Sequence, residues 1–105
     1  MEKTKHSLAI IEEKIINKIY RVRGKKIMLD LDLAEMYAVE TKQLKRQVKR
    51  NIERFPKDFM FVLTGSEFKN LRSRFGTSSW GGTRYMPMAF TEQGVSMLSS
   101  VLNSK

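Results

Sequence analysis

The amino-acid sequence predicts an α+β fold: a small domain with a helix-turn-helix, a short antiparallel β-sheet and about five helices. Three observations support this prediction. Apolar residues recur at helical spacing in several segments, short apolar runs of β type stand between them, and Asp, Thr, Gly and Pro mark the boundaries. The 105 residues, 41% of them hydrophobic, suffice for one modest core.

The first predicted element is an amphipathic helix. Its apolar stripe, with steps of three and four residues, consists of Leu8, Ile11, Ile15, Ile19 and Val22. Ile10 and Ile16 widen this stripe, and Gly24 ends the helix. A helix that is apolar on more than one face usually packs on more than one neighbour. Residues 1–24 are therefore a candidate oligomerisation element, for example in a homodimer, and residues 25–105 form the main domain.

A short run of β type at residues 27–29 leads into the next helix. Asp30 or Asp32 is expected to cap that helix, because a carboxylate accepts the free amides of a first turn. The helix is short, from about residue 31 to residue 37, and residues 38–40 form a tight connection after it.

Thr41 is expected to cap a longer helix that reaches about Arg54, and Pro56 prevents its continuation. Residues 59–63 are apolar on both alternating faces, so we expect a strand that is covered on both sides. A short helix capped by Ser66 follows, and its apolar stripe consists of Phe68, Leu71 and Phe75.

The last third of the chain is predicted to contain a loop, a strand and a helix. Residues 76–83 have the composition of a loop. Residues 84–90 alternate like a strand, and Pro87 suggests that this strand lies at a sheet edge. Thr91 begins a helix that runs nearly to Lys105 without a stop signal, so we expect the natural protein to continue beyond this point.

Charge and composition limit the function. Twenty Lys and Arg residues against eleven Asp and Glu residues give a net charge of +9 and a pI of about 10.0. A field of this sign over so small a body favours polyanions: DNA, RNA or an anionic membrane surface. The absence of cysteine excludes disulfides and zinc fingers and suits a cytoplasmic location. No apolar run approaches the roughly 18 residues of a membrane span, and no signal peptide is apparent.

Residues 31–55 have the pattern of a helix-turn-helix. Such a motif needs a small residue in the first helix, where the second helix crosses closely, and a small or flexible residue in the turn. It also needs an apolar residue after the turn and apolar anchors on the second helix. The residues that meet these requirements are, in order, Ala34, Ala38, Val39, Leu44 and Val48.

The second helix of this motif separates apolar from basic side chains. At about 100° per residue, its apolar side consists of Leu44, Val48, Ile52 and Phe55. The opposite side consists of Lys42, Lys45, Arg46 and Lys49. From Thr41 to Lys57 seven residues are basic and one, Glu53, is acidic. Because a solvated helix face usually mixes charge signs, this pattern predicts DNA binding.

Side-chain chemistry suggests a division of roles on that helix. Its start would enter the major groove, where Gln pairs well with adenine and Arg with guanine. The candidates for base contacts are Thr41, Gln43, Arg46 and Gln47. The candidates for phosphate contacts, which supply affinity without sequence information, are Lys42, Lys45, Lys49, Arg50, Arg54 and Lys57.

A second basic group brackets the predicted loop and consists of Lys69, Arg72, Arg74 and Arg84. Exposed loop amides beside Arg84 could hold phosphates, which would make the loop a wing on the DNA. Trp80, within the loop, is better explained as an aromatic plug for the core.

Four stretches of the chain resemble a known family: LDLAEMY, NIERFPKDFMF, TSSWGG and AFTEQGV. Over about residues 19–104 the sequence is similar to the Orf-six N-terminal domain family, which is related to the KilA-N domains of phage antirepressors and large DNA viruses. The resemblance implies a compact α+β DNA-binding domain, here residues 25–105, common in prophage regulators and often followed by a separate C-terminal region. The family tends to have Gly where this chain has Ala38.

The sequence therefore predicts sequence-specific or semi-specific binding of double-stranded DNA, without a cofactor, in an antirepressor-type transcriptional regulator. The main alternative is a protein-interaction module that binds a repressor or itself through the apolar face at Ile10 and Ile16. Salt dependence separates the two, because phosphate contacts weaken with salt and apolar burial does not. RNA binding is less favoured, since no exposed aromatic platform is apparent.

Catalysis is not expected. His6 is the only histidine, so neither a His-based triad nor a metal cluster can be assembled around it. Asp30, Asp32 and Glu35 could attract a cation, but helix capping and solvent exposure explain these carboxylates more simply.

Overall fold

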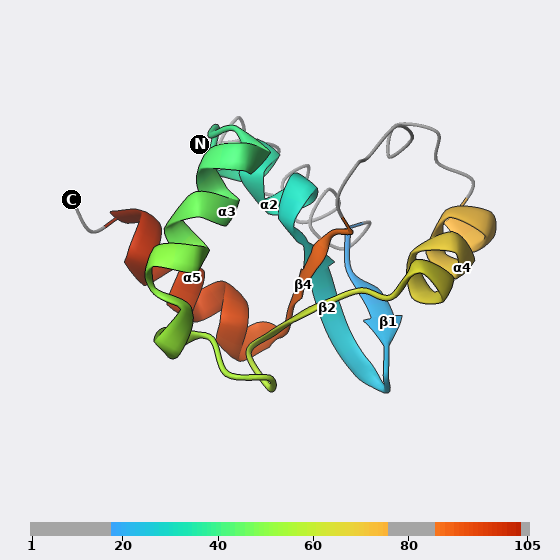
Figure 1. Ribbon diagram of the computed structural model, residues 1–105. Coiled ribbons are helices and arrows are strands. Elements are labelled where there is room, and N and C mark those ends of the chain that lie inside the picture. Colours follow the sequence, from blue (N-terminus) through green and yellow to red (C-terminus); the bar gives the residue numbers. More distant parts are fainter. Residues whose placement is uncertain (1–17, 76–85, 104–105) are drawn as a thin grey trace, which may run out of the picture.

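A computed structural model of the chain describes residues 18–75 and 86–103. In chain order, these residues form β1 (Tyr20–Val22), β2 (Lys25–Leu29), α2 (Asp30–Met36), α3 (Thr41–Arg50), the 3-10 turn η1 (Ile52–Arg54), β3 (Met60–Val62), α4 (Gly65–Phe75), β4 (Met88–Phe90) and α5 (Glu92–Asn103) (Figure 1). The predicted α+β class is confirmed. The described residues hold four α-helices, where about five were predicted for the whole chain.

The prediction of a helix that ends at Gly24 is wrong for Tyr20–Val22, because these residues form β1. In that strand Arg21 is exposed between two buried neighbours, the alternation of a half-buried strand. Arg23 and Gly24 have φ angles of 55° and 71°, the two positive angles of a two-residue type I′ hairpin turn. The hairpin joins β1 to β2. The rest of the predicted helix, residues 1–17, lies outside the described residues, so its role in oligomerisation stays a prediction.

The sheet has the strand order β1-β2-β4-β3, and every neighbouring pair is antiparallel. β4 thus lies inside the sheet, and its predicted place at an edge is wrong. Pro87 precedes β4, and its carbonyl accepts a hydrogen bond from the Leu63 N–H at 3.0 Å. Because the missing N–H of Pro87 falls at the end of the ladder, a proline is tolerated there. In β3, predicted to be covered on both sides, Val62 is 52% exposed.

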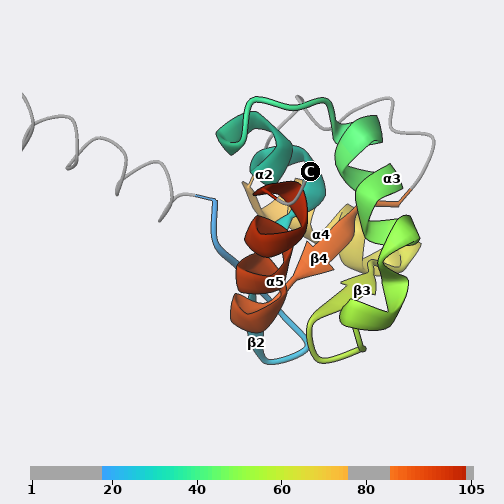
Figure 2. The ribbon, with the colours of Figure 1, turned by 90° about the vertical axis from the view of Figure 1, so that its left-hand side faces the viewer.

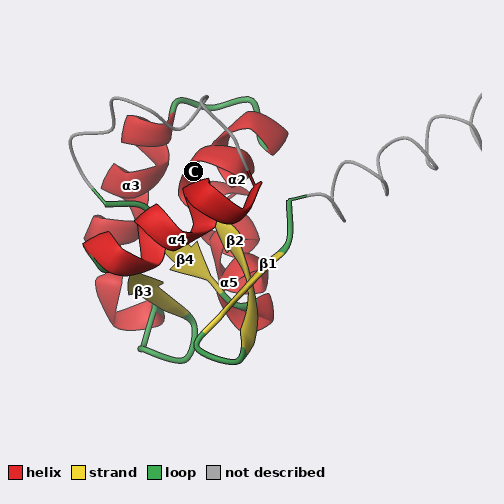
Figure 3. Ribbon diagram, turned by 90° about the vertical axis from the view of Figure 1, so that its right-hand side faces the viewer, coloured by secondary structure: helices red, strands yellow, loops and turns green. Residues whose placement is uncertain are grey.

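Helices cover both faces of the sheet. α2, α3 and α5 lie on one face (Figure 2), and α4 lies on the other (Figure 3). The core on the first face consists of Met28, Leu33, Ala34, Leu44, Val48, Phe55, Met60, Met88, Phe90, Leu98 and Val101. The core on the α4 face consists of Tyr20, Val22, Ile27, Leu29, Phe61, Leu63, Phe68, Leu71 and Ala89. The two-sided sheet explains why β3, β4 and the last three residues of β2 are continuous apolar runs.

Helix α4 begins with a capping box. Thr64 Oγ1 accepts a hydrogen bond from the Glu67 N–H at 3.1 Å, and Glu67 Oε1 accepts one from the Thr64 N–H at 2.8 Å. Thr64, and not Ser66, is therefore the cap. Glu67 also accepts two hydrogen bonds from Arg23, at 2.8 and 3.0 Å, which lower the pKa of Glu67 to about 2. These contacts join the β1–β2 turn to α4.

Helix α5 begins after Thr91, as predicted. Thr91 Oγ1 accepts a hydrogen bond from the Gly94 N–H at 3.3 Å and donates one to the Asp58 carbonyl at 2.7 Å. A Cβ atom at Gly94 would lie 1.8 Å from the carbonyl oxygen of Phe59. Only glycine allows this close approach, so the first turn of α5 lies directly against the segment that leads into β3.

Candidate nucleic-acid interface

Helices α2 and α3 form the predicted helix-turn-helix, and α2 ends in a Schellman motif. The Val39 N–H donates to the Ala34 carbonyl at 2.9 Å, and the Ala38 N–H donates to the Glu35 carbonyl at 3.1 Å. Ala38 has a φ of 56°, a left-handed conformation that favours glycine. The turn therefore needs a residue in the left-handed conformation, at the position where the family that this sequence resembles tends to have Gly.

Two apolar anchors attach α3 to the core: Leu44 and Val48 are both fully buried. The prediction that Ile52 shares their apolar side is wrong, because Ile52 is 52% exposed, whereas Phe55 is buried as predicted. α3 ends at Arg50, before the predicted end at Arg54, and the following 3-10 turn changes the helical period. The predicted cap is also wrong by one residue: Glu40 is the N-cap and Thr41 is the first helical residue.

The predicted site residues fall into three groups. Seven are exposed: Lys42, Gln43, Arg46, Lys49, Arg50, Arg54 and Lys57. Three are half-buried: Thr41, Lys45 and Gln47. Arg84 lies outside the described residues, as do Trp80 and the loop that was considered as a wing. The exposed group is concentrated on α3 and on the segment directly after it.

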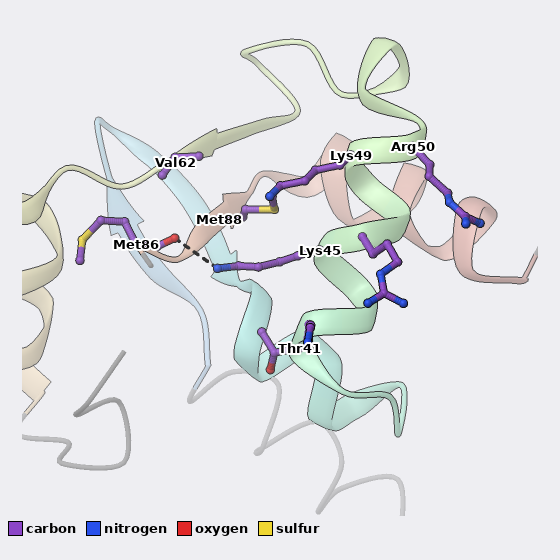
Figure 4. Close-up of a pocket in the computed structure, with 9 residues that line it drawn as sticks. Thr41, Lys45, Lys49, Arg50, Val62, Met86 and Met88 are labelled. Atoms are coloured by element: carbon purple, nitrogen blue, oxygen red, sulfur yellow. Dashed lines mark hydrogen bonds between the residues drawn. The ribbon is translucent and has the colours of Figure 1, made fainter. Parts of the chain in front are cut away.

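Lys45 lies against the sheet and not on the outward face of α3 (Figure 4). Its side chain is 19% exposed, its Nζ donates to the Met86 carbonyl at 3.4 Å, and Nζ lies 3.4 Å from Asp30 Oδ2. The prediction grouped Lys45 with the outward-facing lysines because helical spacing ignores the neighbouring strand. Its ammonium group joins α3 to the start of α2.

Asp30 continues the hydrogen bonding of the sheet beyond the end of β2. Its Oδ2 accepts a hydrogen bond from the Met88 N–H at 3.0 Å, where the next residue of a longer strand would offer a carbonyl. Its Oδ1 accepts one from the Leu31 N–H at 2.7 Å. The side chain is 1% exposed, so the expectation of solvent exposure is wrong, and burial raises the pKa of Asp30 although Met88 and Lys45 oppose this shift.

Asp32 is a second buried carboxylate, 2% exposed. Its Oδ1 lies 3.5 Å from Lys18 Nζ, whereas Oδ2 accepts no hydrogen bond within the described part of the chain. Burial raises the pKa of Asp32, and Lys18 opposes this shift. Burial and the charge of Asp32 together raise the pKa of Tyr20 to about 12. Neither aspartate occupies the N-cap position of α2, which is Leu29, although Asp30 Oδ1 does accept a free amide of the first turn, the Leu31 N–H.

A groove of about 1040 Å³ runs between α3 and the sheet (Figure 4). The α3 residues that line it are Thr41, Lys42, Lys45, Arg46, Lys49 and Arg50. The sheet side consists of Val62, Met86 and Met88. Lys45 and Lys49 reach from α3 toward the strands, whereas Arg50 points away from them. The two sides of α3 therefore differ: one faces the groove, and the other faces away from the sheet.

The described residues contain no group of three His, Asp or Glu side chains that could hold a metal ion. In the same part of the chain, no helix has the length and hydropathy required to cross a membrane.

Comparison with known proteins identifies one family. The model of the ORF6N domain matches residues 17–101, a range that includes all four strands and the complete helix-turn-helix. Neither a curated protein nor a solved structure matches the chain.

Proposed function

The chain belongs to the ORF6N domain family, and from this premise we propose that it binds double-stranded DNA, with at least partial sequence specificity, through α3. α3 is the second helix of a helix-turn-helix, the element that enters the major groove in proteins with this motif. The observation that carries the proposal is the chemistry of its exposed residues, which are Lys42, Gln43, Arg46, Lys49 and Arg50. None of the ten residues of α3 is acidic.

The exposed side chains divide into two roles. Gln43 and Arg46 suit base edges, because each can form two hydrogen bonds with one base. Lys42, Lys49 and Arg50 suit phosphates, whose neutralisation provides affinity regardless of sequence. Beyond α3, the phosphate contacts extend to Arg54 and Lys57, and Thr41 and Gln47 are secondary candidates for base contacts. Lys45 supports the helix from the side of the sheet.

The regulator that we propose is of the phage or prophage antirepressor type, acts in the cytoplasm and has no catalytic role. A homodimer would place two copies of α3 on the DNA, with half-sites separated by about one helical turn or a multiple of it. Binding to a repressor protein is the second candidate activity.

Fluorescence anisotropy with a random duplex across a salt series tests the proposal. The wild type is compared with a Lys42→Gln, Arg46→Gln, Lys49→Gln triple variant and with a control that removes equal charge elsewhere, Lys25→Gln, Lys26→Gln, Lys69→Gln. We expect log affinity to fall linearly with log salt, and the α3 variant to have a slope shallower by up to about 2.7, or roughly 0.9 for each phosphate that is no longer neutralised. The control keeps most of the wild-type slope.

Failure of the wild type to bind duplex DNA at low salt would refute the proposal. It would equally be refuted if the α3 variant bound as the wild type does. Sequence preference is measured separately by selection from a random duplex library. We expect Arg46→Ala to relax the preference at one base pair, at a cost of roughly 1–3 kcal/mol for the preferred base.

A further inference from the structure

Strand β3 lies at an edge of the sheet, and part of its outer backbone is open. The Leu63 N–H donates to the Pro87 carbonyl, and the Phe59 carbonyl accepts from the Thr91 N–H, so these groups face β4. Backbone groups alternate in direction along an antiparallel strand, so those of Val62 face outward. Val62 and Met88 thus form a non-hydrogen-bonded pair of the ladder, and within the described part of the chain the Val62 N–H and C=O form no backbone hydrogen bond outside the sheet.

The open backbone lies next to exposed apolar surface. The Val62 side chain is 52% exposed and lines the groove together with Met86 and Met88. Natural proteins usually protect such an edge with a charge, a proline or a bulge. None of these occurs at Met60–Val62. A short stretch of β3 therefore offers one donor, one acceptor and an apolar contact in the same place.

The opposite wall of the groove is cationic. Lys49 reaches from α3 toward Met88 (Figure 4), while Lys45 on the same wall is paired with Asp30. Among the described residues that line the groove, none is acidic. The charge of Lys49 thus has no carboxylate partner on the walls of the groove.

We propose that this groove binds an extended acidic peptide segment, which adds as a further strand to the outer edge of β3. The segment residue opposite Val62 exchanges two backbone hydrogen bonds with it, and its side chain lies on the same face as that of Val62, toward α3. An apolar side chain at this position covers Val62 and Met86. The residues two positions away lie on the same face, about 6.6 Å further along, where a carboxylate meets Lys49. The expected segment has the pattern acidic-x-apolar-x-acidic.

The chemistry of the groove favours a peptide over a nucleic-acid backbone. A phosphate accepts hydrogen bonds and donates none, so it leaves the Val62 carbonyl unsatisfied, whereas a peptide backbone satisfies both groups. An aliphatic side chain of a peptide also buries the apolar surface on the sheet side of the groove, which a phosphate does not. Lys49 belongs both to this groove and to the proposed DNA-binding residues, so the segment and DNA compete.

The probe is a fluorescein-labelled peptide with the sequence Thr-Glu-Thr-Val-Thr-Glu-Thr, and its control carries N-methylvaline at the centre. The N-methyl group removes the donor to Val62 while keeping the charge. We expect the wild-type protein to bind the probe about tenfold more tightly than the control. Equal binding of both peptides, or no binding of the probe, would overturn the proposal, and neither result depends on the folding of a variant.

Variants of the protein locate the site. Val62→Pro removes the open N–H and should bind the probe about tenfold more weakly than Val62→Ala, while both keep wild-type affinity for duplex DNA. Lys49→Gln should weaken binding of the probe and reduce the salt dependence of that binding. Equal probe binding by Val62→Pro and Val62→Ala would contradict the proposed strand addition. If the probe binds and duplex DNA does not, the peptide site stands and the proposed DNA binding fails.

Discussion

Asp30 and Lys45 join the two helices of the helix-turn-helix to the sheet through a single carboxylate. Asp30 Oδ2 lies 3.4 Å from Lys45 Nζ and accepts a hydrogen bond from the Met88 N–H at 3.0 Å. Asp30 is the first residue of α2, Lys45 lies in the middle of α3, and Met88 is the first residue of β4. This contact therefore holds α3 in its orientation relative to the sheet.

Asp30→Ala should lower the free energy of unfolding by about 3 kcal/mol or more, because it removes the counter-charge of the mostly buried Lys45 ammonium group and leaves the buried Met88 N–H without its acceptor. Asp30→Asn should cost less, since its amide oxygen can still accept from Met88. Urea denaturation followed by circular dichroism measures both values. The exposed Glu35→Ala on the same helix serves as the control. A decrease below about 1 kcal/mol for Asp30→Ala would show that the contact is not structurally important.

Lys45→Gln and Lys49→Gln should separate structural from DNA-contacting lysines. Lys49→Gln is expected to reduce the salt slope of DNA binding by about 0.9, the value for one phosphate contact, without loss of stability. Lys45→Gln should leave that slope unchanged and lower the midpoint of thermal unfolding, since it removes the cation beside the buried Asp30 carboxylate. Equal slope changes in the two variants would mean that Lys45 also contacts phosphate.

Ala38→Gly should stabilise the domain by roughly 1 kcal/mol. Ala38 has a φ of 56°, and the left-handed conformation costs a residue with a Cβ atom roughly 1–2 kcal/mol more than it costs glycine. The flexibility of glycine in the unfolded chain offsets part of this gain. Ala34→Gly, in the buried interior of α2, is the matched control and should destabilise the domain. Chemical denaturation of both variants tests whether the turn conformation is strained.

Asp32→Asn should change how stability depends on pH. Burial raises the pKa of Asp32 above its ordinary value of 3.8, so the folded state holds the proton more tightly than the unfolded state. The resulting stabilisation is complete below pH 3.8 and is lost as the pH rises through the folded-state pKa. In Asp32→Asn this loss should be absent. Urea denaturation at pH values between 4 and 8 compares the variant with the exposed Glu53→Gln, and parallel profiles for the wild type and Asp32→Asn would contradict the prediction.

Gly94→Ala should destabilise the domain by about 3 kcal/mol or more, because the added Cβ atom would overlap the Phe59 carbonyl oxygen, which belongs to the backbone and cannot rotate away. Gly65→Ala is the control, since no atom lies within 4 Å of a Cβ atom built at Gly65. The two midpoints of thermal unfolding should differ by many degrees. Similar midpoints would show that α5 can move away from Phe59 at little cost.

Local sequence was sufficient to predict which side chains are buried where a single helix determines their direction. The steps of three and four residues predicted the burial of Leu44 and Val48, and the small residues predicted the crossing and turn at Ala34 and Ala38. The same spacing failed at Ile52, because a 3-10 turn replaces the α-helix after Arg50. The period of a helix predicts a face only as far as the helix extends.

Strands were harder to predict, since each depends on its partner. The step of three residues from Ile19 to Val22 suggested a helix, whereas Tyr20 and Val22 alternate as in a strand, and the pairing of β1 with β2 decides for the strand. Pro87 suggested an edge, yet β4 lies between β2 and β3, because the proline falls just before the ladder. Nothing in the sequence indicated that β3 has an open edge at Val62, since residues 59–63 are apolar throughout.

The sequence by itself determined the helix-turn-helix, the basic character of α3 and the membership of the family, because these depend on residues within one short segment or on motifs. Only the tertiary structure decided which charges are buried. Asp30 meets Met88 across 58 positions of the chain, and Lys45 meets Met86 across 41. The environment of a charged side chain depends on such distant neighbours, so two lysines four residues apart differ: Lys45 contacts Asp30 and Met86, whereas Lys49 is exposed.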